Sequence, residues 1–434
     1  MALKADMTQK HFVIIFDDFM PESVKFGSKM MQDLALSLLS EGHKVSVITP
    51  VPPREISSNQ CRPYMADYHG VSVYGFPMKP MPPAQGVLDK IKRLRHEMSL
   101  SRHALKTYGK AFKDMSVDGI IYYSPSIFFH PLVRALKSMW GCRSYLVLRD
   151  IFPQWAIDTG ILKNNSPLSL FFKYHERKNY AAADMIGAQT PQNVIDFADK
   201  FGSNYPVDVL YNWVTSPLKK ANVGHDEHGH AAPSKTSNIR NTLSIPEDHT
   251  LFFYGGNLGI AQNITAFVKL ADTVSQERPL SFIFLGRGDR EESVKALCEA
   301  APQCHYLPPV PQAEYLEVLA EIDIGLISLD VRNTTHNVPG KTLNYLANDI
   351  PVAGIVNPKN DLMAMLDARA GCLIDSFDQA AFTAMINKVL QSQKRFQYNC
   401  RGVLEDYFST NLARQTIMQF FETASPTPSR SKER

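Results

Sequence analysis

The residue types that bind phosphate gather in one stretch of the sequence, residues 323–354 (DIGLISLDVRNTTHNVPGKTLNYLANDIPVAG). A polar loop carrying His336 and Asn337 leads into a Pro-Gly turn that is followed by Lys341. Backbone amides at a helix N-terminus and a neighbouring lysine suit a phosphate or diphosphate, and the two loop side chains could reach its sugar or phosphate. Alternatively, the Pro-Gly pair is a common turn sequence without a binding role, and Lys341 is a solvated lysine of the first helical turn.

The elements predicted around this loop place it at the ligand-binding edge of a sheet. The apolar run 324–329 predicts a buried strand, residues 342–347 predict a helix, and residues 350–355 predict a second buried strand. The loop then follows the carboxyl end of the first strand, which is where open α/β sheets bind ligands. The stretch therefore predicts a nucleotide-phosphate site.

Acidic residues follow the first predicted strand of the chain. Residues 11–19 predict a buried strand that delivers Asp17 and Asp18 to its carboxyl end. The helix predicted at 28–40 and the strand predicted at 44–50 complete a right-handed βαβ unit. The first half of the chain therefore begins as a parallel α/β sheet.

Two more features belong to the same edge of that sheet. Gly27 precedes Ser28 in the turn before the first helix, where glycine permits close approach of the backbone to a ligand. The strand predicted at 143–150 ends in Arg149 and Asp150, and an acidic residue there is a site candidate. A plain tight turn explains the glycine equally well, and Arg149 and Asp150 could instead satisfy each other or cap the next helix.

Glycine loops also end two predicted strands in the second half of the chain. The runs 250–263 and 280–290 contain GGN and GRG, without the G-x-G-x-x-G spacing of a dinucleotide-binding loop. These loops lie at the same sheet edge as the Lys341 loop. Two βα series that join near residue 208 predict two Rossmann-like domains, and the cleft between them is the expected binding site.

Composition limits the class of protein. With 434 residues, 44% apolar and 21% charged, the chain is typical of a globular protein of two or more domains. A net charge of +3 is too small to imply nucleic-acid binding. The six cysteines show no metal-ligand spacing and are expected to be reduced thiols of the cytosol. Histidines 225, 228 and 230 could bind a metal, but their segment is more typical of a mobile loop.

One segment, residues 87–113, has unusual charge. Its pattern predicts a helix in which eight lysines and arginines oppose only Asp89 and Glu97, beside an apolar face. Such a helix could lie on an anionic membrane surface, or it could be a solvated surface helix. No run of about 18 apolar residues predicts a membrane span.

These motifs together resemble the retaining glycosyltransferases of family 4, which have the GT-B fold. The likeness covers nearly the whole chain and rests on the turn 26–28, YNWV (211–214), GGNLGIAQN (255–263), GRGDR (286–290) and VPGKTLNYLANDIPVAG (338–354). The segments LRDIFPQWAIDTG (148–160) and NTTHNVPGKTLNYL (333–346) are similar to those of a subgroup that assembles bacterial surface polysaccharide. That subgroup includes N-acetyl-L-fucosamine transferases of O-antigen and capsule synthesis.

The resemblance also implies site residues. The catalytic residues would be Asp150, which orients or deprotonates the acceptor hydroxyl, and His336. The acceptor site would comprise Asp17, Asp18, Gly27 and Ser28, and either aspartate is the second choice for the base. The donor site would comprise Gly256, Asn257, Gln262, Arg287, Arg290, Asn337, Gly340, Lys341, Thr342 and Asn344.

Several positions depart from the family pattern. The usual Glu-x7-Glu pair matches His336 and Asn344, and neither is acidic. The arginine and lysine that grip the donor diphosphate match Asn257 and Gln262. The usual histidine of the N-terminal domain is matched by Arg149-Asp150. Charge for the leaving diphosphate must then come from helix amides, Lys341 and Arg287 or Arg290.

The activity implied by the resemblance is a retaining, metal-independent transfer without a cofactor. The donor would be a UDP-sugar, with an N-acetylated amino sugar such as L-fucosamine. The acceptor would be an undecaprenyl-diphosphate-linked saccharide, and the protein would lie peripherally on the cytoplasmic face of the inner membrane. Two alternatives stay open: a UDP-sugar 2-epimerase of the same fold, and a non-catalytic sugar-nucleotide-binding scaffold.

The expected domain boundaries follow from the two series and from the resemblance. An N-terminal acceptor-binding domain spans 1–207 and a C-terminal nucleotide-sugar-binding domain spans 208–405. A helix at 406–423 crosses back to the first domain in this fold. The tail 424–434, rich in Ser, Pro and basic residues, is expected to be disordered.

Overall fold

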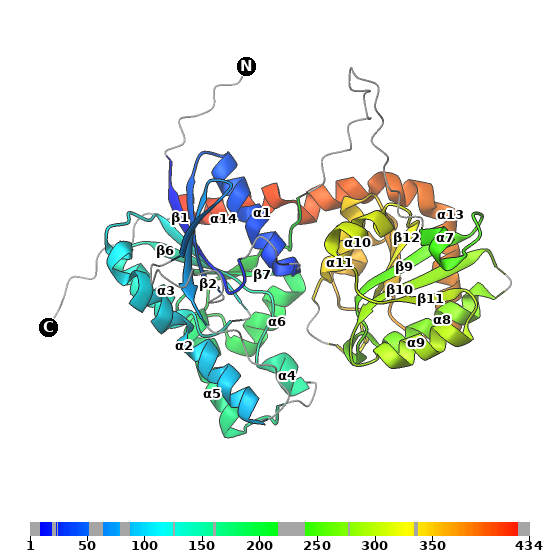
Figure 1. Ribbon diagram of the computed structural model, residues 1–434, viewed down its shortest axis with the longest axis horizontal. Coiled ribbons are helices and arrows are strands. Elements are labelled where there is room, and N and C mark those ends of the chain that lie inside the picture. The colour runs from blue at the N-terminus through cyan, green and yellow to red at the C-terminus, as the bar shows by residue number, and fades with distance from the viewer. Residues whose placement is uncertain are drawn as a thin grey trace, which may run out of the picture. The chain divides into compact units, whose positions relative to one another are not determined.

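The computed structural model describes residues 9–19, 23, 25–51, 64–78, 87–124, 126–158, 162–215, 239–276, 278–333 and 337–423. The three-histidine segment, His336 and the tail 424–434 lie outside these ranges. The chain divides into two compact units, Met1–Tyr211 with Thr410–Arg434, and Asn212–Ser409 (Figure 1). Each unit is built around one sheet, which confirms the prediction of two α/β sheets.

The first unit contains an eight-stranded sheet in the order β3-β4-β2-β1-β5-β6-β7-β8. From β4 to β7 this is the Rossmann order, and the strand order reverses between β1 and β5. The strands are β1 (His11–Ile15), β2 (Lys44–Val51), β3 (Tyr64–Tyr68), β4 (Val71–Pro77), β5 (Gly119–Tyr123), β6 (Arg143–Val147), β7 (Met185–Ala188) and β8 (Val207–Val209). The helices are α1 (Phe26–Ser40), α2 (Val87–Lys113), α3 (His130–Trp140), α4 (Gln154–Asp158), α5 (Pro167–Tyr180), α6 (Pro191–Phe201) and α14 (Thr410–Thr423).

Most of these elements follow the predicted pattern, since parallel strands covered on both faces are apolar throughout. All five residues of β1 are buried, and β1 pairs in parallel with β2 and β5. Strand β3 was not predicted; it pairs antiparallel with β4 at the sheet edge. The boundary expected at 207/208 falls inside β8, which pairs with β7, whereas the units divide after Tyr211.

The second unit contains a six-stranded sheet in the order β11-β10-β9-β12-β13-β14, and the strand pairs among its described residues are all parallel. This is the Rossmann order again, with the reversal between β9 and β12. The strands are β9 (Thr250–Asn257), β10 (Leu280–Arg287), β11 (Cys304–Leu307), β12 (Ile324–Ser328), β13 (Val352–Ile355) and β14 (Gly371–Ile374). The helices are α7 (Ile239–Leu243), α8 (Ile264–Ser275), α9 (Glu291–Ala300), α10 (Gln312–Leu319), α11 (Gly340–Ala347), α12 (Leu362–Leu366) and α13 (Gln379–Val403), with a 3₁₀ turn at Ile260–Gln262 and a π-helical turn at Leu404–Phe408.

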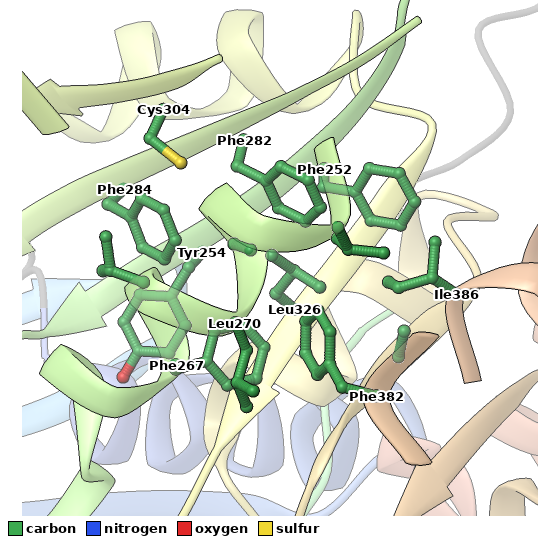
Figure 2. Close-up of a cluster of buried hydrophobic side chains, with 14 of the residues drawn as sticks. Phe252, Tyr254, Phe267, Leu270, Phe282, Phe284, Cys304, Leu326, Phe382 and Ile386 are labelled. Atoms are coloured by element: carbon green, nitrogen blue, oxygen red, sulfur yellow. The ribbon is translucent and has the colours of Figure 1, made fainter. Parts of the chain in front are cut away.

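Aromatic side chains pack the core between this sheet and the helices α8 and α13 (Figure 2). Phe252 of β9 stacks on Phe282 of β10, with ring centroids 4.7 Å apart. Phe267 of α8 meets Phe382 of α13 edge-to-face at 5.2 Å. Because these rings bury one face of β9 and β10, the loops that follow both strands are held by a rigid base.

Helix α14 packs on the first unit. Its Phe420 contacts Tyr145 of β6 with ring centroids 5.4 Å apart, and the guanidinium of Arg143 lies 3.6 Å from the Phe420 ring centroid. Arg414 pairs with Glu41 at 3.3 Å. The last described helix therefore completes the core of the first unit.

Helix α2 has the bounds predicted for it, Val87–Lys113. Its Ala104, Tyr108 and Phe112 are buried against the unit, while most of its basic residues are exposed. Among the helices that the structure describes, neither α2 nor any other is long and apolar enough to span a bilayer.

Candidate functional site

The carboxyl ends of β9 and β10 form one edge of the second unit, beside the reversal of its strand order. In the sheet register Gly286 lies opposite Gly256, and Arg287 lies opposite Asn257. The loops beyond are tied together, since the amide of Leu258 donates to the carbonyl of Arg287 at 2.9 Å. Gly256 and Gly286 have φ angles of 134° and 154°, which residues other than glycine rarely adopt.

Lys341 lies at this edge. It is the second residue of α11, and its Nζ is 3.4 Å from the centroid of the Tyr254 ring on β9. A Cβ placed on Gly256 would lie 3.3 Å from the same nitrogen, so the ammonium lies against the end of β9. The predicted loop and the two glycine loops therefore meet in one place.

The charge of Lys341 has no carboxylate partner among the described residues. Lys341 as a whole keeps part of its surface exposed, but protein atoms surround its ammonium, and this desolvation lowers the pKa of Lys341 well below 10.5. The Tyr254 ring attracts the cation through its π face. An anion that bound here would supply the missing counter-charge.

Two amide side chains extend the site. The Nδ2 of Asn257 donates to the Oε1 of Gln262 at 2.8 Å. The 3₁₀ turn that carries Gln262 is held by Ser328, whose hydroxyl donates to the Gln262 carbonyl at 2.5 Å, and by Asp289, which accepts from the amide of Ile260 at 3.2 Å. The two amides therefore form a neutral pair beside the Lys341 site.

Helix α11 is anchored to β9 by its own side chains. The hydroxyl of Tyr345 accepts from the amide of Gly255 at 3.2 Å and donates to the carbonyl of Phe253 at 3.1 Å. Thr342 is completely buried, and its Oγ1 has no hydrogen-bond partner among the described residues. Because Thr342 points into the protein, its side chain does not share the exposed edge with Asn257.

The remaining predicted donor residues differ in their exposure and in their contacts. Arg287 and Arg290 are both exposed, at the end of β10 and at the N-terminus of α9. Gly340 is the first residue of α11, and Asn344 is hydrogen-bonded to Tyr315. The carbonyl of Asn337 accepts from Asn360 at 3.2 Å.

The first unit gathers a second set of polar residues at the carboxyl ends of β1, β5 and β6. The charges of Asp17, Asp150 and Arg149 all act on the hydroxyl of Tyr123, the last residue of β5. Burial is the largest effect and raises the pKa of Tyr123. A Cβ on Gly27 would lie 2.8 Å from the Tyr123 hydroxyl, so glycine allows α1 to begin this close to β5.

The two predicted acceptor aspartates have different surroundings. Asp18 forms a 3.0 Å ion pair with Lys25 and accepts from the Ser23 hydroxyl at 2.8 Å, while its carbonyl accepts from Ser28 at 2.6 Å. Asp17 keeps surface open to solvent, but protein atoms crowd its carboxyl and desolvation raises its pKa, against an opposing effect of Lys25. Asp18 is therefore held by contacts with Lys25 and Ser23, whereas burial opposes the charge of Asp17.

Arg149 is held by main-chain carbonyls. Its guanidinium donates to Leu148 at 3.0 Å and to Tyr211 at 3.2 Å, and burial lowers the pKa of Arg149 to about 10. Asp150 is partly exposed, and its carbonyl accepts weakly from Ser124 at 3.5 Å. Arg149 is therefore buried inside the unit, whereas Asp150 keeps part of its surface exposed.

Sequence reasoning missed two residues of the first unit. Tyr123 is the last residue of β5, and a position at the carboxyl end of a strand could have identified it. Glu97 of α2 lies close enough to Asp17 for the two charges to interact; burial raises the pKa of Glu97, Arg93 lowers it and Asp17 raises it. Its position on a helix far from Asp17 in the sequence gave no sign of this. No three His, Cys, Asp or Glu side chains within the described ranges are grouped to hold a metal ion.

Comparison with known proteins places this architecture among glycosyltransferases. No protein-family model matches the chain. It is 23% identical over 261 residues to a Pseudomonas aeruginosa protein named as glycosyltransferase WbjE, covering 59% of this chain and 62% of WbjE. It is 23% identical over 292 residues to Escherichia coli (strain K12) WcaI, which is named as a glycosyl transferase of colanic acid biosynthesis. That alignment covers 65% of this chain and 67% of WcaI. The alignment thus spans less than two thirds of WbjE.

Similarity to solved structures extends further along the chain. A trehalose-6-phosphate structure from E. coli, bound with UDP-2-fluoro glucose, superposes with a TM-score of 0.68 and 11% identity over 96% of this chain and 100% of that one. Sucrose-phosphate synthase from Thermosynechococcus elongatus superposes with a TM-score of 0.66 and 10% sequence identity. That superposition covers 95% of this chain and 98% of the synthase. The chain therefore has the GT-B fold of glycosyltransferases, as predicted, and its curated relatives WbjE and WcaI carry glycosyltransferase names.

Proposed function

We propose that this protein transfers a sugar, with retention of configuration, from a UDP-sugar to a lipid-linked saccharide in the synthesis of bacterial surface polysaccharide. The observation that carries the proposal is Lys341, a cation without a carboxylate partner among the described residues, at the switch point of a GT-B sheet. A diphosphate is the anion that a nucleotide-sugar would bring to it.

The donor class follows from this site and from the comparisons. A structure of the same fold is bound with UDP-2-fluoro glucose. In this chain the diphosphate would meet Lys341, the amides at Gly340 and the backbone of Gly256, with Asn257 and Gln262 as neutral donors beside it. Arg287, at the end of the neighbouring strand, could add a second charge.

The donor sugar and the acceptor rest on the resemblance and on the relatives' names. WcaI is named for colanic acid biosynthesis, and the motifs around Asp150 and Lys341 are similar to those of N-acetyl-L-fucosamine transferases. We therefore propose an N-acetylated amino sugar as the transferred group and an undecaprenyl-diphosphate-linked saccharide as the acceptor. The protein would act on the cytoplasmic face of the inner membrane.

The chemistry needs a group that handles the acceptor proton and donors that stabilise the leaving diphosphate. Asp150 would orient or deprotonate the acceptor hydroxyl, with Asp17 as the second candidate. His336 would contact the donor, and Asn344 would replace the second glutamate of the family pattern. Preorganised donors such as Lys341 stabilise charge that develops as the diphosphate leaves.

The test is UDP release from a panel of UDP-sugars in EDTA, with and without a lipid-diphosphate-linked N-acetylglucosamine. Acceptor-dependent release from one donor would support metal-independent transfer. Lys341→Ala should lower turnover about 100-fold or more, because it removes one donor to the leaving group. The matched control is Lys295→Ala, which changes an exposed lysine of α9.

Other outcomes would overturn parts of the proposal. Conversion of the donor without acceptor would indicate a UDP-sugar 2-epimerase. Binding of a UDP-sugar without any release would indicate a non-catalytic scaffold. If Lys341→Ala bound and turned over the donor as the wild type does, the phosphate assignment would be wrong.

A further inference from the structure

The charge of a diphosphate exceeds that of the one lysine that the proposed donor site places beside it. The site brings together Lys341 and the neutral amide pair of Asn257 and Gln262. A diphosphate carries more than one negative charge, and the leaving nucleoside diphosphate gains another as the bond to the sugar breaks. A further cation at the same edge of the sheet would therefore improve the charge balance.

The loop that follows β12 begins at this edge. Strand β12 lies next to β9 at the reversal of the strand order, and the chain beyond it leads to α11 and Lys341. Two hydrogen bonds tie the beginning of this loop to the 3₁₀ turn after β9. The Ser328 hydroxyl donates to the carbonyl of Gln262 at 2.5 Å. The amide of Asp330 donates to the carbonyl of Ala261 at 2.9 Å, so Asp330 lies beside the turn that carries Gln262.

Arg332 of this loop is an exposed arginine with a fixed side chain. Its Nε donates to the Oδ1 of Asp330 at 2.9 Å, and its Nη2 donates to the Oδ2 at 2.5 Å. The side chain of Asp330 is only 12% exposed, whereas that of Arg332 is 84% exposed. Because a guanidinium is planar, this bidentate contact fixes the direction of its outer edge, and the N–H groups of that edge face solvent.

The carboxylate that holds Arg332 is itself held by the loop. The Oδ1 of Asp330 accepts from the main-chain amide of Arg332 at 2.9 Å, and its carbonyl accepts from the amide of Asn333 at 2.8 Å. The hydrogen bond from the Arg332 side chain lowers the pKa of Asp330, so the carboxylate is charged at neutral pH. The guanidinium is therefore oriented before any ligand arrives, which reduces the entropy that binding would cost.

We propose that Arg332 is a second cationic ligand of the donor diphosphate and that Asp330 is the residue that positions it. The outer edge of the guanidinium would donate to diphosphate oxygens from the beginning of the loop, and Lys341 would meet them from its end. The inference rests on the proposed function, because the diphosphate is the ligand proposed there. Arg287 and Arg290 lie at the end of β10, one strand further from the reversal.

A simpler role for the pair of Arg332 and Asp330 is to stabilise the turn of the loop. The experiment therefore compares UDP with uridine, by isothermal titration calorimetry of the full chain in EDTA without acceptor. The ratio of the Kd for uridine to the Kd for UDP measures what the diphosphate adds to binding. A purely structural pair would leave this ratio unchanged.

Substitutions of Arg332 should change the ratio through UDP alone. Arg332→Gln should lower it about tenfold or more, because charged donors are lost and the carboxylate of Asp330 is left beside the diphosphate. The affinity for uridine should stay the same. Arg332→Lys should restore only part of the ratio, since an ammonium does not reproduce the planar fork. Asp330→Asn/Arg332→Gln should bind UDP more tightly than Arg332→Gln, because the repelling charge is gone.

Asp330→Asn tests the positioning role. The Oδ1 of an asparagine can still accept from the main-chain amide of Arg332, but its Nδ2 cannot accept from the Nη2. The substitution also makes the site more positive, which by itself would tighten the binding of UDP. We expect weaker binding of UDP instead, because the guanidinium loses its fixed direction. Tighter binding would show that Asp330 does not position Arg332 for the ligand.

The matched control is Arg369→Gln. Arg369 also pairs with an aspartate, since its Nη2 donates to Asp406 at 2.5 Å, but it precedes β14 and so lies at the opposite, amino-terminal edge of the sheet. The control should bind UDP and uridine as the wild type does. Melting temperatures would verify that every variant is folded.

The proposal is overturned if Arg332→Gln keeps the wild-type ratio, or if Arg369→Gln lowers the ratio as much. If Lys341→Ala lowers the ratio while Arg332→Gln does not, the diphosphate site stands and only the role of Arg332 is wrong. If the wild type binds UDP no more tightly than uridine, the diphosphate site and this inference are both wrong. Loss of UDP affinity in Arg332→Gln from a protein that transfers no sugar would support Arg332 and contradict the proposed transfer.

Discussion

The ammonium of Lys341 lies where burial disfavours its positive charge. Its ammonium lies over the Tyr254 ring and against Gly256, and desolvation lowers the pKa of Lys341. A group that is held in an unfavourable charge state without a ligand often serves a function, because binding of the ligand relieves the cost.

The pH dependence of activity follows from that lowered pKa. In the proposed function the protonated lysine binds the diphosphate, so kcat/KM should fall as the pH rises through the pKa of Lys341 in the free protein, which lies well below 10.5. The bound diphosphate favours the charged form, so the fall in kcat should occur at higher pH. Steady-state kinetics at pH 6 to 11 would measure both. The basic limb should disappear in Lys341→Arg, since arginine stays charged.

The same shift makes a prediction about stability. Between the folded and unfolded pKa values of Lys341 the unfolded state binds more protons, so the free energy of unfolding rises with pH. At neutral pH the desolvation of Lys341 destabilises the folded state, and Lys341→Met should stabilise the protein by about 0.5–2 kcal/mol. Thermal melts without donor would measure it. A lower melting temperature for Lys341→Met at pH 7 would contradict this account.

At the scale of elements, the site depends on how closely β9 and β10 bring their loops together. A Cβ on Gly286 would lie 1.8 Å from the carbonyl oxygen of Gly256, which is main chain and cannot turn aside. Gly286 also has a φ of 154°. The ends of these two strands can therefore approach this closely because residue 286 is glycine.

Gly286→Ala should destabilise the second unit by about 1–3 kcal/mol or more, because strain and a main-chain clash add. The matched control is Gly402 in α13, where a Cβ meets nothing within 4 Å. Gly402→Ala should stabilise by about 0.5–1 kcal/mol, as alanine favours the helix. Denaturant melts of both variants would test this. If Gly286→Ala and Gly402→Ala changed the stability equally, the close approach of β9 and β10 would not require glycine at position 286.

At the scale of the whole molecule, the chain builds its two Rossmann sheets one after the other and then returns to the first with α14. Ile417 is completely buried and Phe420 is 7% exposed, so the last helix belongs to the core of the first unit. The second unit, with Lys341, depends on α13 for its own core.

Ile417→Ala should therefore destabilise the first unit by about 2–5 kcal/mol and leave the second unit unchanged. Hydrogen exchange followed by mass spectrometry would locate the loss, with Gln419→Ala, which changes an exposed neighbour, as the control. UDP-sugar should still slow exchange in the loops around Lys341. Faster exchange in α8 and α13 of the variant would show that the two units unfold together.

Most helices and strands could be predicted from the sequence, since alternation and helical periodicity are local properties of the chain. It predicted α2 with its observed bounds and the strand–loop–helix unit that carries Lys341. It did not reveal β3, whose place depends on a hydrogen-bonded partner rather than on its own pattern.

The directions of the side chains depend on packing between distant segments. It placed Lys341 over Tyr254, buried Thr342, turned Arg149 toward main-chain carbonyls and brought Glu97 near Asp17. Each of these arrangements joins segments that are distant in the sequence, or depends on which face of a helix the packing covers. Spacing along the chain indicates which residues share an edge of a sheet, whereas contacts across the core decide which of them meet.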